Sequence, residues 1–259
     1  MSALRYVYGI LPSTAAASVD AASLRGIDDA PVRSIADGPF AAAVSDLDET
    51  EWGPDAIDQR VRDVDALAPY AAAHQAVNAK LLDIAGVVLP LSFGTLYRDD
   101  ARVRDMLRED ARAKEDRLDA LAGRAEWVVT VVRGETIGPS ADERLLELDR
   151  EIASSTPGRG YLLEKRRTSV ADAAAERADA DAARRALQAL EEHSERTYRE
   201  VVASGGPDVI VLRVSVLAPR ERSAAIDRTI ETLGQSLAAN GYRVRASGPW
   251  PAYRFGSLP

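Results

Sequence analysis

Short runs of apolar residues alternate along this chain with longer stretches in which apolar positions recur at helical spacing. Residues 4–11 form an aromatic and β-branched run that predicts a strand. Residues 32–35 and 40–44 predict two further strands, which we expect to be antiparallel because only a short turn separates them. The stretch 56–85 has helical spacing that Pro69 interrupts, which predicts a kinked helix or two helices.

The next two segments complete a first domain. Residues 86–94 are apolar but contain Pro90, which predicts an edge, a bulge or an unpaired segment rather than a central strand. Residues 99–121 carry one apolar stripe on an otherwise charged helix, which Gly123 is placed to end. We therefore place an N-terminal α/β domain at residues 1–122.

The second half opens with residues 126–132, an almost unbroken run of strand-forming residues. A polar helix is predicted near 142–153, followed by a loop over 154–160. A long helix is predicted at about 160–203, because residues 161–204 contain neither Pro nor Gly. Alanines spaced by three and four residues give this helix a seam that can pack closely against another helix.

The remaining pattern predicts a strand at 208–217, a helix at 221–239 and a final strand at 242–246. The order of elements suggests an antiparallel or mixed sheet with helices on one face, a split β-α-β or ferredoxin-like arrangement. We expect this domain to span residues 123–259, so that the fold class is α+β with two domains.

The end of the chain, from Gly248 to Phe255, places two prolines around Trp250 and adds two further aromatic residues. Such a segment has little backbone entropy to lose on ordering and offers large apolar faces. One interpretation is a C-terminal latch that seals a core, and the other is an aromatic contact surface for a partner. The candidate partner-binding residues are Trp250, Tyr253, Arg254 and Phe255.

The composition of the chain argues against several classes of function. The 259-residue chain has a formal net charge of -8, which disfavours binding to nucleic acid phosphates, and it has no cysteine, which excludes thiol chemistry. The sequence has no apolar run as long as a membrane span. Its start faintly resembles a signal peptide, but one Arg and the early Pro12 make a cytoplasmic protein the better interpretation.

Candidate chemistry is sparse. Neither His74 nor His193 has a second imidazole at helical spacing, so we expect no metal site. Residues 46–57 begin like a calcium loop but lack its glycine and its final glutamate. The segment 157–160 could present backbone N–H groups to an anion, yet it lacks a Walker or dinucleotide pattern. We expect no cofactor and no enzymatic activity.

Five motifs, taken in order along nearly the whole chain, resemble the gas vesicle accessory proteins of the GvpF/GvpL family. They are Tyr6 to Ile10, Val88 to Thr95, Glu126-Trp127, Gly158 to Leu162, and Gly248 to Phe255. The chain departs from the family pattern at Ser92, where a basic residue is expected, and at Ala252, where a further proline is common. The family's local contacts are therefore not carried over to these two positions.

The resemblance implies a cytoplasmic, non-enzymatic protein needed to assemble the gas vesicle, a hollow protein shell. It implies an N-terminal α/β domain and a C-terminal domain with a modified ferredoxin fold, and contacts with the hydrophobic shell protein and other accessory proteins. No lipid membrane is implied as a partner. The competing hypothesis is an enzyme or ligand sensor with a pocket between the two domains, around Tyr6, Tyr8 and Phe93.

Overall fold

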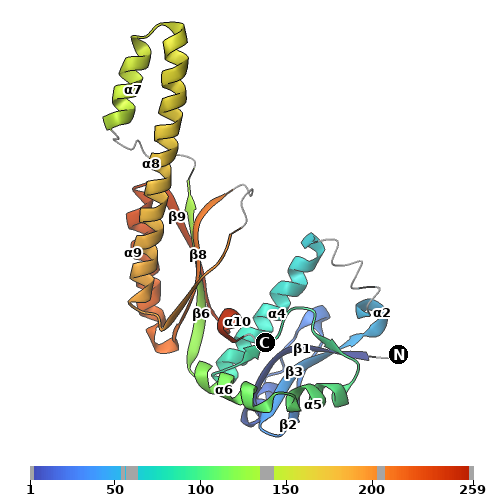
Figure 1. Ribbon diagram of the computed structural model, residues 1–259. Coiled ribbons are helices and arrows are strands. Elements are labelled where there is room, and N and C mark those ends of the chain that lie inside the picture. Colours follow the sequence, from blue (N-terminus) through green and yellow to red (C-terminus); the bar gives the residue numbers. More distant parts are fainter. Residues whose placement is uncertain (1–2, 54–55, 57–63, 135–142, 203–207, 257–259) are drawn as a thin grey trace. The chain divides into compact units, whose positions relative to one another are not determined.

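The computed structural model of the chain describes residues 3–53, 56, 64–134, 143–202 and 208–256. The fold mixes helices and sheets, and the chain divides into two compact units (Figure 1). The first unit contains Met1–Glu126, Leu217–Arg220 and Gly248–Pro259, and the second contains Trp127–Val216 and Glu221–Ser247. The end of the chain thus belongs with the first unit by its contacts, whereas we expected it to belong with the second domain.

The sheet of the first unit is built around β1 (Ala3–Pro12) in the order β2-β3-β1-β4, and β5 (Leu96–Tyr97) also pairs with β1. β2 (Val32–Asp37) and β3 (Phe40–Asp48) form the predicted antiparallel hairpin. β4 (Leu89–Pro90) lies at the edge of the sheet, as Pro90 predicted.

Helices lie on both faces of this sheet. α1 (Ala16–Ala21) and α4 (Val64–Ala85) lie on one face, and α5 (Asp100–Arg108) and α6 (Ala111–Leu121) lie on the other (Figure 1). α2 (Glu49–Trp52) and two 3₁₀ turns, Ser13–Ala15 and Ile27–Asp29, complete the connections. Pro69 lies inside α4, and the part of the predicted 56–85 helix before residue 64 is outside the described residues, apart from residue 56.

The single helix predicted over residues 99–121 is wrong, because the chain forms two helices there. Glu109 leaves the helical region and Asp110 adopts a left-handed backbone with φ of 45°. Neither residue is a glycine or a proline, so the sequence contains no strong break signal. Gly123 has φ of 69° and follows the second helix, as predicted.

The second unit is built on a four-stranded sheet in the order β7-β8-β6-β9. Its strands are β6 (Arg124–Arg133), β7 (Arg196–Arg199), β8 (Val209–Pro219) and β9 (Tyr242–Trp250). α8 (Pro157–Glu191) and α9 (Ser223–Ala238) lie on one face of this sheet, and α7 (Glu143–Ala153) packs against α8 (Figure 1). A 3₁₀ turn, Arg220–Arg222, precedes α9.

α8 differs from its prediction at both ends. Residues 157–160 form its first turn and not a loop, because Pro157 occupies a position where a missing N–H costs nothing. The helix ends at Glu191 and not near 203, and residues 196–199 form β7 instead. Beyond β7 the backbone N–H of Glu200 donates to the carbonyl oxygen of Arg213 at 2.8 Å. Pairing with β8, the next strand along the chain, therefore overrides the local helical preference.

Candidate functional site

The C-terminal segment, residues 248–256, is the candidate site with the most specific contacts. It leaves β9 at Trp250 and makes one helical turn, α10 (Tyr253–Gly256). The Gly256 N–H donates to the carbonyl oxygen of Ala252 at 2.6 Å, which closes this turn. A Cβ at Gly256 would lie 3.2 Å from Cδ1 of Leu121, so the absence of a side chain lets the turn lie close to α6.

Phe255 anchors the segment in the core of the first unit. Its side chain is 4% exposed and belongs to one buried cluster with residues of the sheet, α5 and α6. Arg117 Nη1 donates to the carbonyl oxygen of Phe255 at 3.0 Å, and the backbone N–H of Arg254 donates to Glu126 Oε2 at 2.8 Å. Packing and hydrogen bonds together therefore hold the last turn in place.

The structure places the four predicted partner-binding residues in different environments. Phe255 is buried, Trp250 and Tyr253 are partly buried, and Arg254 is exposed. Of the two interpretations left open by the sequence, these positions favour the latch for Tyr253 and Phe255. A partner-binding role for the four residues stays a prediction.

Tyr253 lies against a polar and aromatic cluster around His74 of α4. The ring centroids of Tyr253 and His74 are 6.4 Å apart, and the Tyr6 hydroxyl forms a hydrogen bond with Nδ1 of His74 at 2.8 Å. The backbone N–H of Gly94 donates to the same hydroxyl at 3.1 Å, and the Phe93 ring lies 6.0 Å from that of His74. We call His74, Asn78, Tyr6 and Tyr8 the tyrosine seat.

Asn78 is the second polar residue of the seat, one helical turn after His74. Its Nδ2 donates to the carbonyl oxygen of Tyr8 at 3.1 Å and to the carbonyl oxygen of His74 at 3.3 Å. Gly9 permits this approach of α4, because a Cβ there would lie 2.8 Å from Asn78 Oδ1. The tyrosine seat thus joins α4 to strand β1 and also contacts Tyr253 of the C-terminal segment.

Burial keeps the seat uncharged near neutral pH. Loss of water around His74 lowers its pKa to about 4, and burial raises the pKa of Tyr253 to about 12. Burial also raises the pKa values of Tyr6 and Tyr8. A neutral site of this kind can bind and orient an aromatic side chain without an ion pair.

From the sequence alone we expected no metal site at His74 and did not predict the tyrosine seat. A usable signal was present, since His74 and Asn78 are four residues apart and therefore share one face of a helix. Their partners Tyr6 and Tyr8 also share a face, because they are two residues apart in a strand. The sequence could not predict that this face of the helix packs against this face of the strand.

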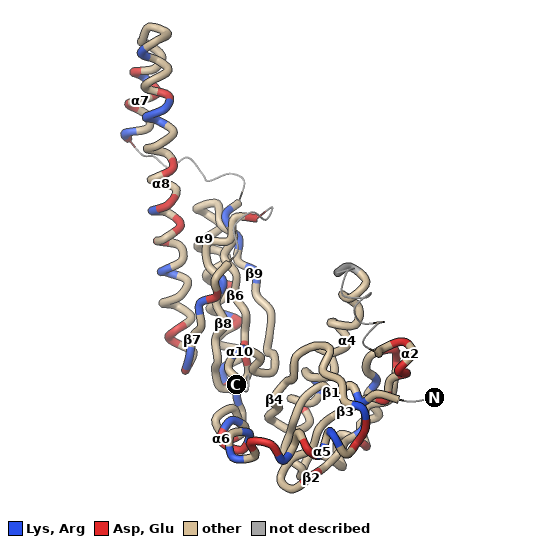
Figure 2. The backbone as a smooth tube through the Cα atoms, turned by 45° about the vertical axis from the view of Figure 1, so that its right-hand side comes forward, with Lys and Arg blue, Asp and Glu red and all other residues tan. Residues whose placement is uncertain are grey.

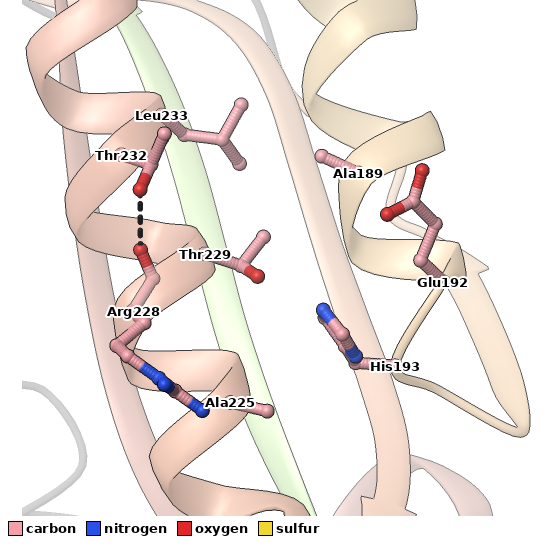
Figure 3. Close-up of a pocket in the computed structure, with 8 residues that line it drawn as sticks. All are labelled: Ala189, Glu192, His193, Ala225, Arg228, Thr229, Thr232 and Leu233. Carbon is pink, nitrogen blue, oxygen red and sulfur yellow. Dashed lines mark hydrogen bonds between the residues drawn. The ribbon is translucent and has the colours of Figure 1, made fainter.

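A separate cleft of about 430 Å³ lies between α8 and α9 of the second unit (Figure 3). It is lined by apolar and polar side chains, which are Ala189, Ala225, Leu233, Glu192, His193, Arg228, Thr229 and Thr232. The competing hypothesis had placed a pocket around Tyr6, Tyr8 and Phe93. There Tyr6 and Tyr8 are fully buried with ring centroids 4.9 Å apart, while Phe93 is 37% exposed.

Within residues 3–53, 56, 64–134, 143–202 and 208–256, no three His, Asp or Glu side chains are grouped so that they could hold a metal ion. None of the helices in those ranges is both long enough and apolar enough to cross a membrane.

Comparison with known proteins gives one consistent family. The family described as "Gas vesicle synthesis protein GvpL/GvpF" matches residues 4–257. Gas vesicle protein L of Streptomyces sp. (strain CB03234) is 30% identical and covers 98% of this chain and 93% of its own length. Gas vesicle protein L2 of Halobacterium salinarum is 28% identical and covers 97% of this chain and 90% of its own length.

Solved structures share the fold. The crystal structure of the gas vesicle protein GvpF from Microcystis aeruginosa covers all of both chains with a TM-score of 0.70 at 16% identity. That of GvpF from Anabaena sp. PCC7120 covers 100% of this chain and 98% of its own with a TM-score of 0.68, also at 16% identity.

Proposed function

Because the chain belongs to the GvpL/GvpF family of gas vesicle synthesis proteins, we propose that it is a non-enzymatic accessory protein that binds the hydrophobic shell protein during vesicle assembly. The observation that carries this proposal is the family match over residues 4–257, which leaves almost no part of the chain for an unrelated activity. Relatives named gas vesicle proteins L and F support a role connected with the gas vesicle.

The physical argument is that a shell subunit with an apolar face must be kept from collapsing before it joins the wall. An acidic chain with a formal net charge of -8 stays dispersed and can present apolar side chains to such a subunit. We infer that other gas vesicle accessory proteins are further partners and that the protein acts in the cytoplasm, next to the growing vesicle.

For the binding surface we propose the C-terminal segment. Arg254 is exposed and Trp250 is partly buried, so these two side chains can reach a partner directly. Phe255 and Tyr253 contribute by fixing the backbone that presents them. This assignment separates contact residues from anchoring residues within the four that the sequence predicted.

At the level of the fold, we propose that the second unit is a ferredoxin-like module with a long helical insertion. Support comes from its element order, β6, helices α7 and α8, β7, β8, α9 and β9, together with the strand order β7-β8-β6-β9. We retain residues 1–122 and 123–259 as the proposed domains by sequence, with the C-terminal segment contributing its contacts to the first unit.

The test is capture of purified major shell protein by the full-length chain, comparing wild type with Trp250→Ala and Arg254→Ala. We expect capture by the wild type and several-fold weaker capture by both variants. Tyr198→Ala is a matched control, because Tyr198 is an aromatic residue that is 43% exposed on β7. Circular dichroism and thermal unfolding verify that each variant is folded.

The outcomes separate the hypotheses. Capture that Trp250→Ala and Arg254→Ala leave unchanged would restrict the C-terminal segment to its latch role and remove it as the binding surface. Failure of the wild type to capture the shell protein would overturn the proposed function. It would turn attention to a small ligand in the cleft between α8 and α9, where Arg228, His193 and Thr229 offer donors.

A further inference from the structure

The helical hairpin of the second unit is formed by α7 and the first turns of α8 (Figure 1). Leu148 of α7 and Leu163 of α8 are buried within it. An ion pair between Asp149 and Arg167 joins the two helices and marks residues that lie opposite each other. The hairpin thus has its own inner apolar contact, and its outer faces are not needed for that contact.

The outer faces nevertheless carry large apolar side chains. Leu146 of α7 is 51% exposed, and Tyr161 and Leu162 of α8 are 67% and 65% exposed. Single exposed apolar residues are common on protein surfaces, but three on one short hairpin are a local concentration of exposed apolar side chains. The charged residues of the two helices indicate what kind of surface would cover them.

The charges on the two outer faces are of opposite sign. On α8, Arg159, Lys165 and Arg166 surround Leu162 and Tyr161 at helical spacing, and all three are exposed. Among the described residues these three cations form no ion pair, in contrast to Arg167. Glu164 is also exposed, three residues after Tyr161, so three cations against one anion make the α8 face basic on a chain that is acidic overall.

On α7 the exposed residues Glu143, Glu147 and Glu151 follow one another every four residues and form an acidic row on the solvent side of the helix. Arg144 and Arg150 are also exposed and flank this row, so three glutamates against two arginines leave the face with a small negative charge. None of the three glutamates forms an ion pair with another described residue. Figure 2 shows both signs of charge along the hairpin.

We propose that the hairpin binds a second copy of this chain, with the outer face of α7 in each copy against the outer face of α8 in the other. We infer a second copy as the partner because each chain has both an acidic and a basic face. Two copies related by a twofold axis can then form both acidic-to-basic contacts at once. Asp149 and Arg167 lie opposite each other at the same height along the antiparallel hairpin. Glu151, two residues further along α7, and Lys165, two residues earlier in α8, therefore also lie at one height. A twofold axis along the hairpin then brings Glu151 of one copy to Lys165 of the other.

The expected association is weak and salt-sensitive. α7 has 11 residues and is about 16 Å long, so the contact falls well below the ~800 Å² per partner of a standard stable interface. Salt screens the exposed ion pairs and so weakens the association. The leucines and Tyr161 supply the smaller part of the association free energy, which does not depend on salt.

The experiment is sedimentation velocity on the full-length chain over about a hundredfold range of concentration, at low and high salt. The two test variants are Lys165→Glu with Arg166→Glu, which makes both outer faces acidic, and Glu147→Lys with Glu151→Lys, which makes both basic. A control with the same change in net charge as the first variant carries Arg222→Glu and Arg228→Glu, which lie outside the hairpin.

We expect the wild type and the control to associate at low salt, and each hairpin variant alone to associate at least about tenfold more weakly. A mixture of the two hairpin variants is expected to form a heterodimer, since each then finds its opposite charge in the other. A wild type that stays monomeric at low salt and high concentration would overturn the proposal. So would hairpin variants that associate as the wild type does, or a mixture that forms no heterodimer.

Discussion

The C-terminal segment and the α7–α8 hairpin carry similar residues, but the structure uses them in opposite ways. Phe255 is 4% exposed in a core, whereas Tyr161 is 67% exposed on a helix. Both stretches combine aromatic residues with arginines, so composition alone would assign them the same role. The difference teaches that an aromatic residue indicates an interaction surface only after its own fold has been shown not to bury it.

The largest expected effect comes from removing the buried aromatic side chain of the C-terminal segment. Phe255→Ala removes a buried aromatic side chain and should lower the free energy of unfolding by about 3 to 5 kcal/mol, measured by urea denaturation. Arg254→Ala is the neighbouring control, and its exposed side chain should change stability by no more than about 0.5 kcal/mol. Equal effects of the two variants would contradict the anchoring role of Phe255.

The tyrosine seat should make stability depend on pH. The pKa of His74 is about 4 in the folded chain and near 6.5 in the unfolded chain, so the unfolded chain binds more protons between these values. Stability from this group is complete above pH 6.5 and falls as the pH is lowered to 4, by about 3 kcal/mol in all. The measurement is urea denaturation at a series of pH values.

A control isolates His74 from the carboxylates that also titrate in this range. His74→Gln, which carries no titrating group, should show a shallower fall in stability between pH 6.5 and 4 than the wild type does. Parallel curves for the two proteins would contradict the pH role assigned to His74, whatever the absolute stability of the variant.

A smaller effect is expected in the α7–α8 hairpin, where a buried and an exposed leucine can be compared. Leu163→Ala removes a side chain that is 8% exposed between α7 and α8, and it should destabilise the hairpin by about 2 kcal/mol. Leu162→Ala, at 65% exposure, should change stability by less than about 0.5 kcal/mol. Hydrogen exchange of the α7 amides in dilute protein is the readout. Matching losses of protection would show that Leu162 also packs within one copy.

The smallest expected effect concerns the ion pair between Arg167 and Asp149. Both side chains are more than 40% exposed, so water and salt screen the pair and its contribution to stability should be small. Arg167→Gln is therefore expected to lower the thermal midpoint only slightly, and this loss should disappear at high salt. A large loss that persists at high salt would show that Arg167 acts through packing of its stem.

Local patterns predicted much of the fold. The hairpin of β2 and β3 was correct because apolar runs and a short turn determine it locally, and the edge position of residues 86–94 followed from Pro90. The predicted end of α8 was wrong because residues 192–195 contain no glycine or proline, while β7 forms through its pairing with β8, the next strand along the chain.

The candidate site was less predictable than the fold. The C-terminal aromatic residues were recognised, but the seat joins Tyr6 to His74 across 68 positions and His74 to Tyr253 across a still longer stretch. Such contacts depend on how strands and helices assemble, and a single sequence carries no record of them. Periodicity could give the faces that each element presents, but not which faces meet.

The assignment of residues 248–259 to the first unit has a consequence for the order in which a ribosome delivers the chain. Nearly all of the first unit is synthesised at the outset, yet Ala252 and Phe255, which complete its buried cluster, emerge only after the entire second unit. Its core therefore stays unsealed throughout translation. A chain that stops before Ala252 leaves that core open to solvent and to proteases, so that copies lacking this segment do not reach full stability.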